Sequence, residues 1–213
     1  MKRFGKLGIL LAVLIVLAAM PAVANTSTYL ITVTSGLTGT QGLGFALVAG
    51  DDLPGNNSVF LSGFNFYGGS GPDVGTDSCF GGCSGNLSSA VSLTEDGSFV
   101  SLFTQNFDPM YFSMFVTLTN DAPNDGNLSP TPAEFQMFLC TADFSSCYGS
   151  NQVTGALVTV DLTGAPLSFN TYGDGTVGVT AAYVPVPESG SILVLLSSGL
   201  LGLAGLWRRH SHR

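Results

Sequence analysis

The chain has 213 residues, of which 45% are hydrophobic and only 9% are charged, and its formal net charge is −8. This length suits one domain of ordinary size with short appendages and excludes a second large core. The charged fraction is far below the roughly 25% of an average soluble domain while apolar residues are ample, so the chain is neither a disordered polyelectrolyte nor a typical cytosolic protein.

The charges are unevenly placed. All six Lys and Arg residues lie at the two ends, and residues 25–184 hold thirteen carboxylates with no Lys, Arg or His, a formal charge of −13. Such a region cannot neutralise phosphates, which excludes nucleic acid and anionic lipid as partners of a basic face. It also lacks the histidine bases and lysine nucleophiles of most catalytic mechanisms. We therefore expect a protein that is not an enzyme.

The first 24 residues have the three parts of a secretory signal. A short basic start is followed by an apolar run over residues 7–19 and by a small-residue ending with Ala22 and Ala24. This pattern predicts a signal peptide over 1–24 that is cleaved after Ala24, so the secretion translocon and signal peptidase are expected partners. The alternative, an uncleaved anchor, is less favoured because the apolar run is short for a membrane span.

Residues 25–184 show apolar and polar residues in alternation, separated by turns rich in Gly, Asn, Asp and Pro. No convincing helical periodicity occurs there. The alternation predicts about nine short strands, each with one face toward a core. The predicted strands cover residues 29–33, 43–48, 58–66, 87–93, 98–104, 112–118, 134–139, 156–162 and 176–183. We therefore expect an all-β ectodomain, an antiparallel β-sandwich or jelly roll.

Two turn sequences and two longer loops separate predicted strands in this region. Glu95-Asp96-Gly97 and the turn at 172–175 are typical of hairpins. Residues 67–86 form the longest stretch without strand character, and residues 120–132 are turn formers throughout. Long loops often carry function, but the first also holds two cysteines that are favoured to staple it.

The four cysteines form two close pairs, Cys79 with Cys83 and Cys140 with Cys147. An even count in an exported chain indicates disulfides, and the sequence leaves three connectivities open. Local pairing within each close pair is the one we favour. A zinc site is disfavoured by the spacings and by the oxidising compartment.

Loop carboxylates and amides raise the question of calcium. Asp121, Asn124, Asp125 and Asn127 supply the oxygen ligands that calcium prefers. Prolines stand at 123 and 132, where an EF-hand would need ligands, so this is not an EF-hand. The same residue types are ordinary turn formers, and that interpretation is favoured over a bound ion.

Sugar binding and sugar hydrolysis are the alternatives for a matrix protein. Phe64, Phe66 and Tyr67 run into the long loop and are candidates for stacking on sugars. A pair of carboxylates in a cleft would suffice for a glycoside hydrolase, but nothing in the sequence locates such a pair. Alternating threonines between 26 and 40 resemble an ice-binding ladder, although Thr is common on solvent-facing strand positions.

The C-terminal part, residues 185–213, divides into a motif at 185–189, an apolar run at 192–207 and a basic tail at 208–213. A helix over the run would be about 24 Å long, short of the roughly 30 Å hydrocarbon thickness. The basic tail would stay in the cytoplasm and leave the ectodomain outside.

These residues resemble the PEP-CTERM sorting signal of exopolysaccharide-producing Gram-negative bacteria. The matching positions are Pro187 and Glu188, the Gly- and Leu-rich helix, and Arg208 with Arg209; Ser189 stands where the second proline is usual. The resemblance implies recognition by exosortase, a membrane-embedded cysteine transpeptidase or protease. The alternative is a plain C-terminal anchor.

Together these observations predict a non-enzymatic exported protein that is held briefly in the inner membrane and then reaches the cell surface or extracellular matrix. We expect a structural or adhesive role in exopolysaccharide or biofilm. The alternative is a secreted carbohydrate-binding module or a carboxylate-dependent glycoside hydrolase.

Overall fold

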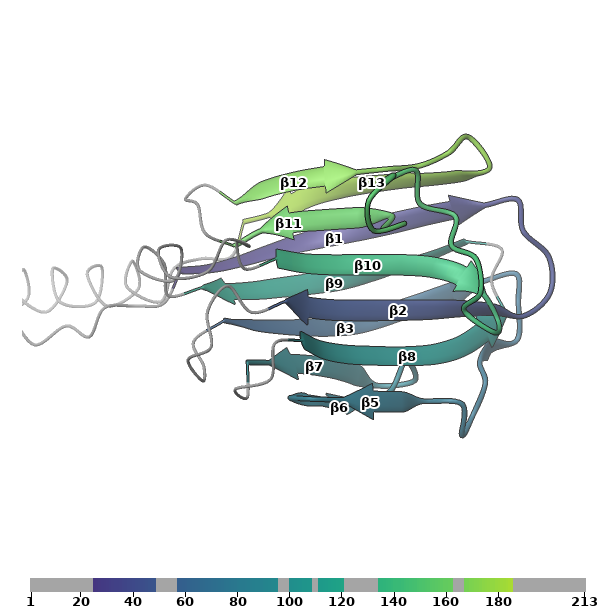
Figure 1. Cartoon of the computed structure of the whole chain (residues 1–213), viewed down its shortest axis with the longest axis horizontal. Coiled ribbons are helices and arrows are strands. Elements are labelled where there is room, and N and C mark those ends of the chain that lie inside the picture. Colours follow the sequence, from purple (N-terminus) through teal and green to yellow (C-terminus); the bar gives the residue numbers. More distant parts are fainter. Residues whose placement is uncertain are drawn as a thin grey trace, which may run out of the picture.

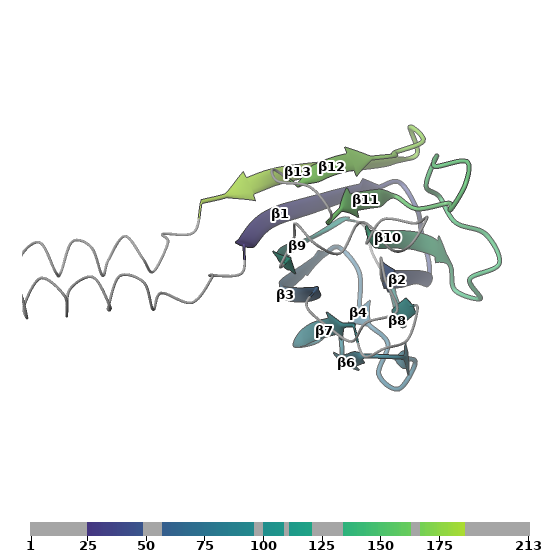
Figure 2. The same cartoon turned by 60° about the vertical axis from the view of Figure 1, so that its left-hand side comes forward.

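The computed structural model describes residues 25–48, 57–95, 100–108, 111–120, 134–162 and 167–185. These residues form two antiparallel sheets packed face to face (Figures 1 and 2). Sheet A has the strand order β13-β1-β9-β3-β7-β6, and sheet B has the order β12-β11-β10-β2-β8-β4, with β5 also paired to β8. The predicted all-β antiparallel sandwich is confirmed for this part of the chain.

The strands of sheet A are β1 (Asn25–Ser35), β3 (Ser58–Tyr67), β6 (Cys83–Gly85), β7 (Ala90–Thr94), β9 (Tyr111–Asn120) and β13 (Val177–Val184). Those of sheet B are β2 (Gln41–Val48), β4 (Gly71–Pro72), β5 (Ser78–Phe80), β8 (Val100–Asp108), β10 (Glu134–Thr141), β11 (Val158–Asp161) and β12 (Ser168–Thr171). All nine predicted strands are present. The structure adds β12 and the three short strands β4, β5 and β6, which break up the stretch 67–86 that we expected to be a loop.

The core lies between the sheets and is built by the alternation seen in the sequence. On β9, for example, every second residue from Phe112 to Leu118 is fully buried. Phe45 of β2 lies between Phe103 and Phe135 of the neighbouring strands, with ring centroids 6.3 and 6.4 Å away. Burying each such ring stabilises the fold by about 1.5–3 kcal/mol.

Rings also join the two sheets. Phe107 of β8 and Phe112 of β9 meet edge to face with centroids 5.2 Å apart. Edge-to-face pairs of this kind add to the energy of burial alone. The sheets are therefore fixed to each other by specific contacts as well as by burial.

The sequence predicted two hairpins that the structure does not contain. The turn that begins at Glu95 leads from β7 in sheet A to β8 in sheet B, and the turn at 172–175 leads from β12 in sheet B to β13 in sheet A. Both connections cross from one sheet to the other. Two strands that flank such a crossing direct their apolar residues into the same core from opposite sides, so their alternation is identical to that of a true hairpin.

Two connections close the sides of the sandwich. The β5–β6 segment is divided between the sheets, since β5 pairs with β8 and β6 pairs with β7. On the other side Phe169 of β12 packs on Tyr29 of β1, with ring centroids 4.4 Å apart. Figure 2 shows β12 with β13 at the upper margin of the two layers and β6 at the lower margin.

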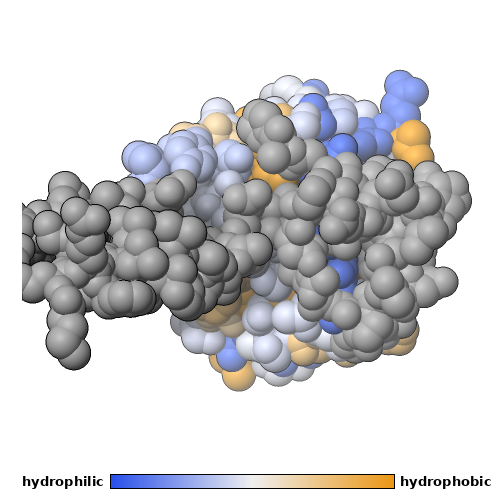
Figure 3. All heavy atoms as spheres, turned by 90° about the vertical axis from the view of Figure 1, so that its left-hand side faces the viewer, coloured by the Kyte–Doolittle hydropathy of each residue, from blue (hydrophilic) through white to orange (hydrophobic). Residues whose placement is uncertain are grey.

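The two ends of the described chain lie side by side. β1 pairs with β13 along almost its whole length, from Thr28 opposite Val184 to Ser35 opposite Val177. Figure 1 shows both ends leaving from the same end of the sandwich. Seen from that end, the visible surface of the described residues is mostly hydrophilic with separate small hydrophobic areas (Figure 3).

Candidate functional site

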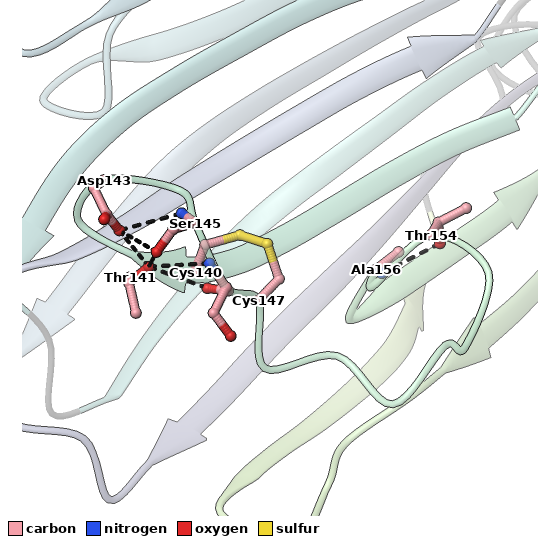
Figure 4. The surroundings of a disulfide bond; sticks show 8 residues. Cys140, Thr141, Asp143, Ser145, Cys147, Thr154 and Ala156 are labelled. Atoms are coloured by element: carbon pink, nitrogen blue, oxygen red, sulfur yellow. Dashed lines mark hydrogen bonds between the residues drawn. A yellow bond between two sulfur atoms is a disulfide. The ribbon is translucent and has the colours of Figure 1, made fainter.

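The loop that follows β10 is closed by a disulfide between Cys140 and Cys147 (Figure 4). The two cysteines also form an isolated antiparallel bridge. Hydrogen bonds on either side continue the pairing, from Thr141 N to Ser146 O at 2.8 Å and from Tyr148 N to Leu139 O at 2.8 Å. The second disulfide joins Cys79 to Cys83 in the β5–β6 segment. The local pairing favoured from the sequence is therefore the one observed.

Asp143 organises the Cys140–Cys147 loop. Its Oδ1 accepts hydrogen bonds from Thr141 Oγ1 at 2.7 Å, from Ser145 Oγ at 2.8 Å and from Ser145 N at 3.2 Å. These donors favour the ionised carboxylate and lower the pKa of Asp143 to about 2, with the Thr141 hydroxyl as the largest cause. The carboxylate is thus occupied by its own loop, and we assign it a structural role.

Phe144, at the tip of this loop, folds back over sheet B. Its backbone has a φ of 56°, which non-glycine residues rarely adopt. Its ring lies directly on Gly42 of β2, so that a Cβ at position 42 would be only 2.5 to 2.9 Å from three ring carbons. The loop is therefore fastened to the sheet by an aromatic contact that a glycine makes room for.

The outer face of sheet A carries a second arrangement. It includes four exposed aromatic side chains from β3 and β9: Phe60 (47% exposed), Tyr67 (36%), Tyr111 (44%) and Phe115 (39%). Hydroxyl and amide groups stand beside them on neighbouring outward positions: Thr28, Thr32, Ser62, Asn65, Ser113 and Thr117. We call these ten residues the aromatic–hydroxyl face.

The strand register orders the rings of this face. Tyr67 lies directly opposite Tyr111, and their rings stack at 4.3 Å with planes 10° apart. The amide of Asn65 donates to the hydroxyl of Tyr67. Phe60 is opposite Thr117, so it is the diagonal neighbour of Phe115 across the ladder. The aromatic groups therefore form a strip along β3 and β9.

A β-bulge explains why the sequence identified this strip only in part. The register of β3 shifts between Ser62 and Asn65, and Gly63 has a φ of 62°. The bulge reverses the inward and outward positions, so Phe64 and Phe66 pack against the core while Tyr67 points out. Of the three candidates for stacking on sugars, Phe64 and Phe66 are thus partly buried core residues, and only Tyr67 is an exposed ring. The sequence did contain a signal for the bulge: the aliphatic residues occupy odd positions before Gly63 (Val59, Leu61) and the phenylalanines occupy even positions after it (Phe64, Phe66).

The strands that carry the aromatic–hydroxyl face contain no carboxylate. No Asp or Glu occurs in the six strands of sheet A, whereas the register of sheet B places Glu134 opposite Asp161. Glu134 accepts a hydrogen bond from the amide of Gln136 at 2.9 Å. Among the described residues, no three His, Cys, Asp or Glu side chains are grouped so that they could hold a metal ion.

Several predicted site residues lie outside the described residues. They are the signal-cleavage residues Ala22 and Ala24, the calcium candidates Asp121, Asn124, Asp125 and Asn127, and the sorting residues Pro187, Glu188, Arg208 and Arg209. The predicted helix at 192–207 does so as well. Within the described ranges, no helix has the length and apolar character needed to cross a bilayer.

Comparison with known proteins gives no relative. No family model, no curated protein and no solved structure matches this chain. The functional argument therefore rests on the sequence signals at the two ends of the chain and on the surface of the described body.

Proposed function

We propose that this protein is a non-enzymatic exported protein of the cell surface or extracellular matrix, sorted through an exosortase-type system. The observation that carries the proposal is the pair of terminal signals at 1–24 and 185–213 around a body without a single cationic side chain. In that setting its role is structural or adhesive, within exopolysaccharide or biofilm.

Two features of the described body support export. Both disulfides close short loops, and such bonds persist in oxidising compartments outside the cytoplasm. In addition β13 ends at Val184, three residues before Pro187, and it is fastened to β1 along its length. The predicted sorting motif therefore follows directly on a strand that is held in the sheet.

Intact mass of the protein recovered from its producing cells, with and without the exosortase gene, tests the proposal. We expect a mature chain that begins at Asn25 and lacks Trp207 in cells with exosortase, and a chain that keeps Trp207 in cells without it. Recovery of the same mass from both kinds of cell would contradict exosortase processing. As an internal check, trypsin should leave residues 25–184 uncut even after unfolding, because they contain no Lys or Arg.

The hydrolase alternative can be tested at Glu134 and Asp161. Residues directly opposite in an antiparallel ladder have Cβ atoms about 4.5–5.5 Å apart, and Glu134 and Asp161 hold such positions. A retaining glycosidase needs two carboxyl groups about 5–5.5 Å apart, a separation that side chains on opposite positions can adopt. A screen for polysaccharide hydrolysis by the protein and by its Glu134→Gln variant decides this alternative. The alternative requires that the protein is active and that the variant is not.

A further inference from the structure

The proposed function leaves the aromatic–hydroxyl face without a role. We propose that this face binds a neutral polysaccharide, with the sugar chain lying along the strip of rings on β3 and β9. This inference rests on the proposed location in an exopolysaccharide matrix and names the ligand class and the surface that takes it.

The first argument is the spacing of the exposed rings. Tyr111 and Thr117 are six residues apart on β9, and Phe60 lies beside Thr117, so the strip from the tyrosine pair to Phe60 is roughly 20 Å long at about 3.4 Å per residue. A strip of this length accommodates several sugar units in a row. A single small ligand would leave most of the rings exposed.

The second argument is chemical. The C–H faces of sugar rings are apolar and pack on the electron-rich faces of aromatic rings, while their hydroxyls need partners that both donate and accept. Threonine and serine hydroxyls have both capacities. Here Thr28 and Thr117 already exchange a hydrogen bond at 3.0 Å between their Oγ1 atoms, which places a hydroxyl pair next to Phe60.

The third argument is charge, and it selects the occupant. None of the six strands of sheet A contains a charged residue, whereas residues 25–184 as a whole carry thirteen carboxylates and no cation. Acidic polysaccharides and a second copy of this chain are both repelled by such a body at low salt. A neutral polymer is not repelled, and the uncharged face offers it no desolvated carboxylate.

The fourth argument is that the Phe115 ring lies down against the backbone of β3. The ring of Phe115 covers Gly63, where an added Cβ would lie 2.8 Å from Cδ2 of the phenylalanine. Gly63 thus supplies both the positive φ of the bulge and the space in which the ring lies down. The ring is held close to the backbone, in the position a platform needs.

Native affinity electrophoresis tests this inference with the full chain, expressed with its leader and recovered in mild detergent. The probes are hydroxyethyl cellulose, dextran and xylan as neutral polymers and alginate as an acidic one. We expect retardation by at least one neutral polymer and none by alginate. Absence of retardation by all three neutral polymers would overturn the proposal.

Substitutions locate the surface. Phe115→Ser and Tyr67→Ser should each weaken retardation at least tenfold. Phe80→Ser should not, because Phe80 has a more exposed ring (67%), lies on β5, which pairs with β8 of sheet B, and is not part of the aromatic–hydroxyl face. Equal loss in all three variants would show that exposed rings act nonspecifically and would refute the assignment. Thermal unfolding of each variant verifies that it is folded.

A second pair of variants keeps every ring in place. Ser113→Glu adds a carboxylate between Tyr111 and Phe115 and should abolish retardation, whereas Ser88→Glu, in an exposed turn outside the face, should leave it unchanged. If the Ser113→Glu variant is retarded by neutral polymers as strongly as the parent protein, the proposal is contradicted.

Sedimentation distinguishes the remaining occupant. A dimer that Phe115→Ser dissociates would assign the face to a second copy of the chain and would refute glycan binding. The two proposals can fail separately. A chain that keeps its tail in the producing cells but binds a neutral polymer would contradict the sorting proposal alone. A chain that is processed as expected but binds no neutral polymer would contradict the face assignment alone.

Discussion

Gly42 and Gly44 provide a sharp test of how the Cys140–Cys147 loop is held on sheet B. The two glycines lie two residues apart on β2 and face the same side, toward Phe144. An added Cβ at 42 would meet the Phe144 ring at 2.5 to 2.9 Å, whereas one at 44 would find its nearest neighbours at 3.6 Å. The first distance is a clash and the second is ordinary contact.

Gly42→Ala must therefore displace the ring. Phe144 cannot swing away freely because its loop is closed by the disulfide and its backbone has a φ of 56°. Overpacking of this kind costs about 1–3 kcal/mol. For a chain of this size the melting temperature should fall by roughly 3 to 10 °C. Gly44→Ala should be neutral or stabilise the fold by up to about 1 kcal/mol, since alanine reduces the freedom of the unfolded chain.

Urea unfolding of the oxidised protein measures both variants, and a third completes a double-mutant cycle. Phe144→Ala removes the ring, so Gly42→Ala should cost little in that background. The reasoning is refuted if the two glycine variants have equal stability, or if the cost of Gly42→Ala is the same with and without the ring.

Three further predictions concern stability. Asp143 has a pKa lowered to about 2, so its contribution is complete above the unfolded value of 3.8 and disappears as the pH falls toward 2; Asp143→Asn should remove this pH dependence in urea titrations between pH 5 and 2. The buried Gln105 accepts a hydrogen bond from Leu87 N at 2.8 Å, and Gln105→Leu should cost about 1–3 kcal/mol by leaving that buried N–H without its partner, while an unchanged urea midpoint would contradict this role. Replacing Cys140 and Cys147 together by serine should cost about 2 kcal/mol from loop entropy, measured by thermal unfolding, and a stability equal to that of the parent would show that the loop is held by other contacts alone.

The alternation of apolar residues predicted most of the fold because the burial pattern has the period of a strand. On β9 and β10 the residues expected inside are fully buried, including Met114 and Met137. β12 was missed because its four residues contain a single apolar side chain, Phe169, too few to show a period.

What the sequence could not predict is which strands are neighbours. A turn such as the one after Glu95 has the same composition whether it joins paired strands or crosses between sheets. The outer aromatic strip was equally hidden, because its rings come from two strands that are distant in sequence and meet only through the register of Tyr67 with Tyr111. Each ring taken alone looks like an ordinary strand residue.

The ladder between β1 and β13 makes folding depend on the completeness of the chain. The first strand of the body has the last as one of its two neighbours, so sheet A stays open at β1 until the final strand is present. Contacts between such remote parts of a chain form slowly. Sheet A therefore cannot be completed before residues 177–184 have been synthesised. A product that stops short of Val177 keeps β1 as an uncovered edge, which offers unpaired N–H and C=O groups to another chain.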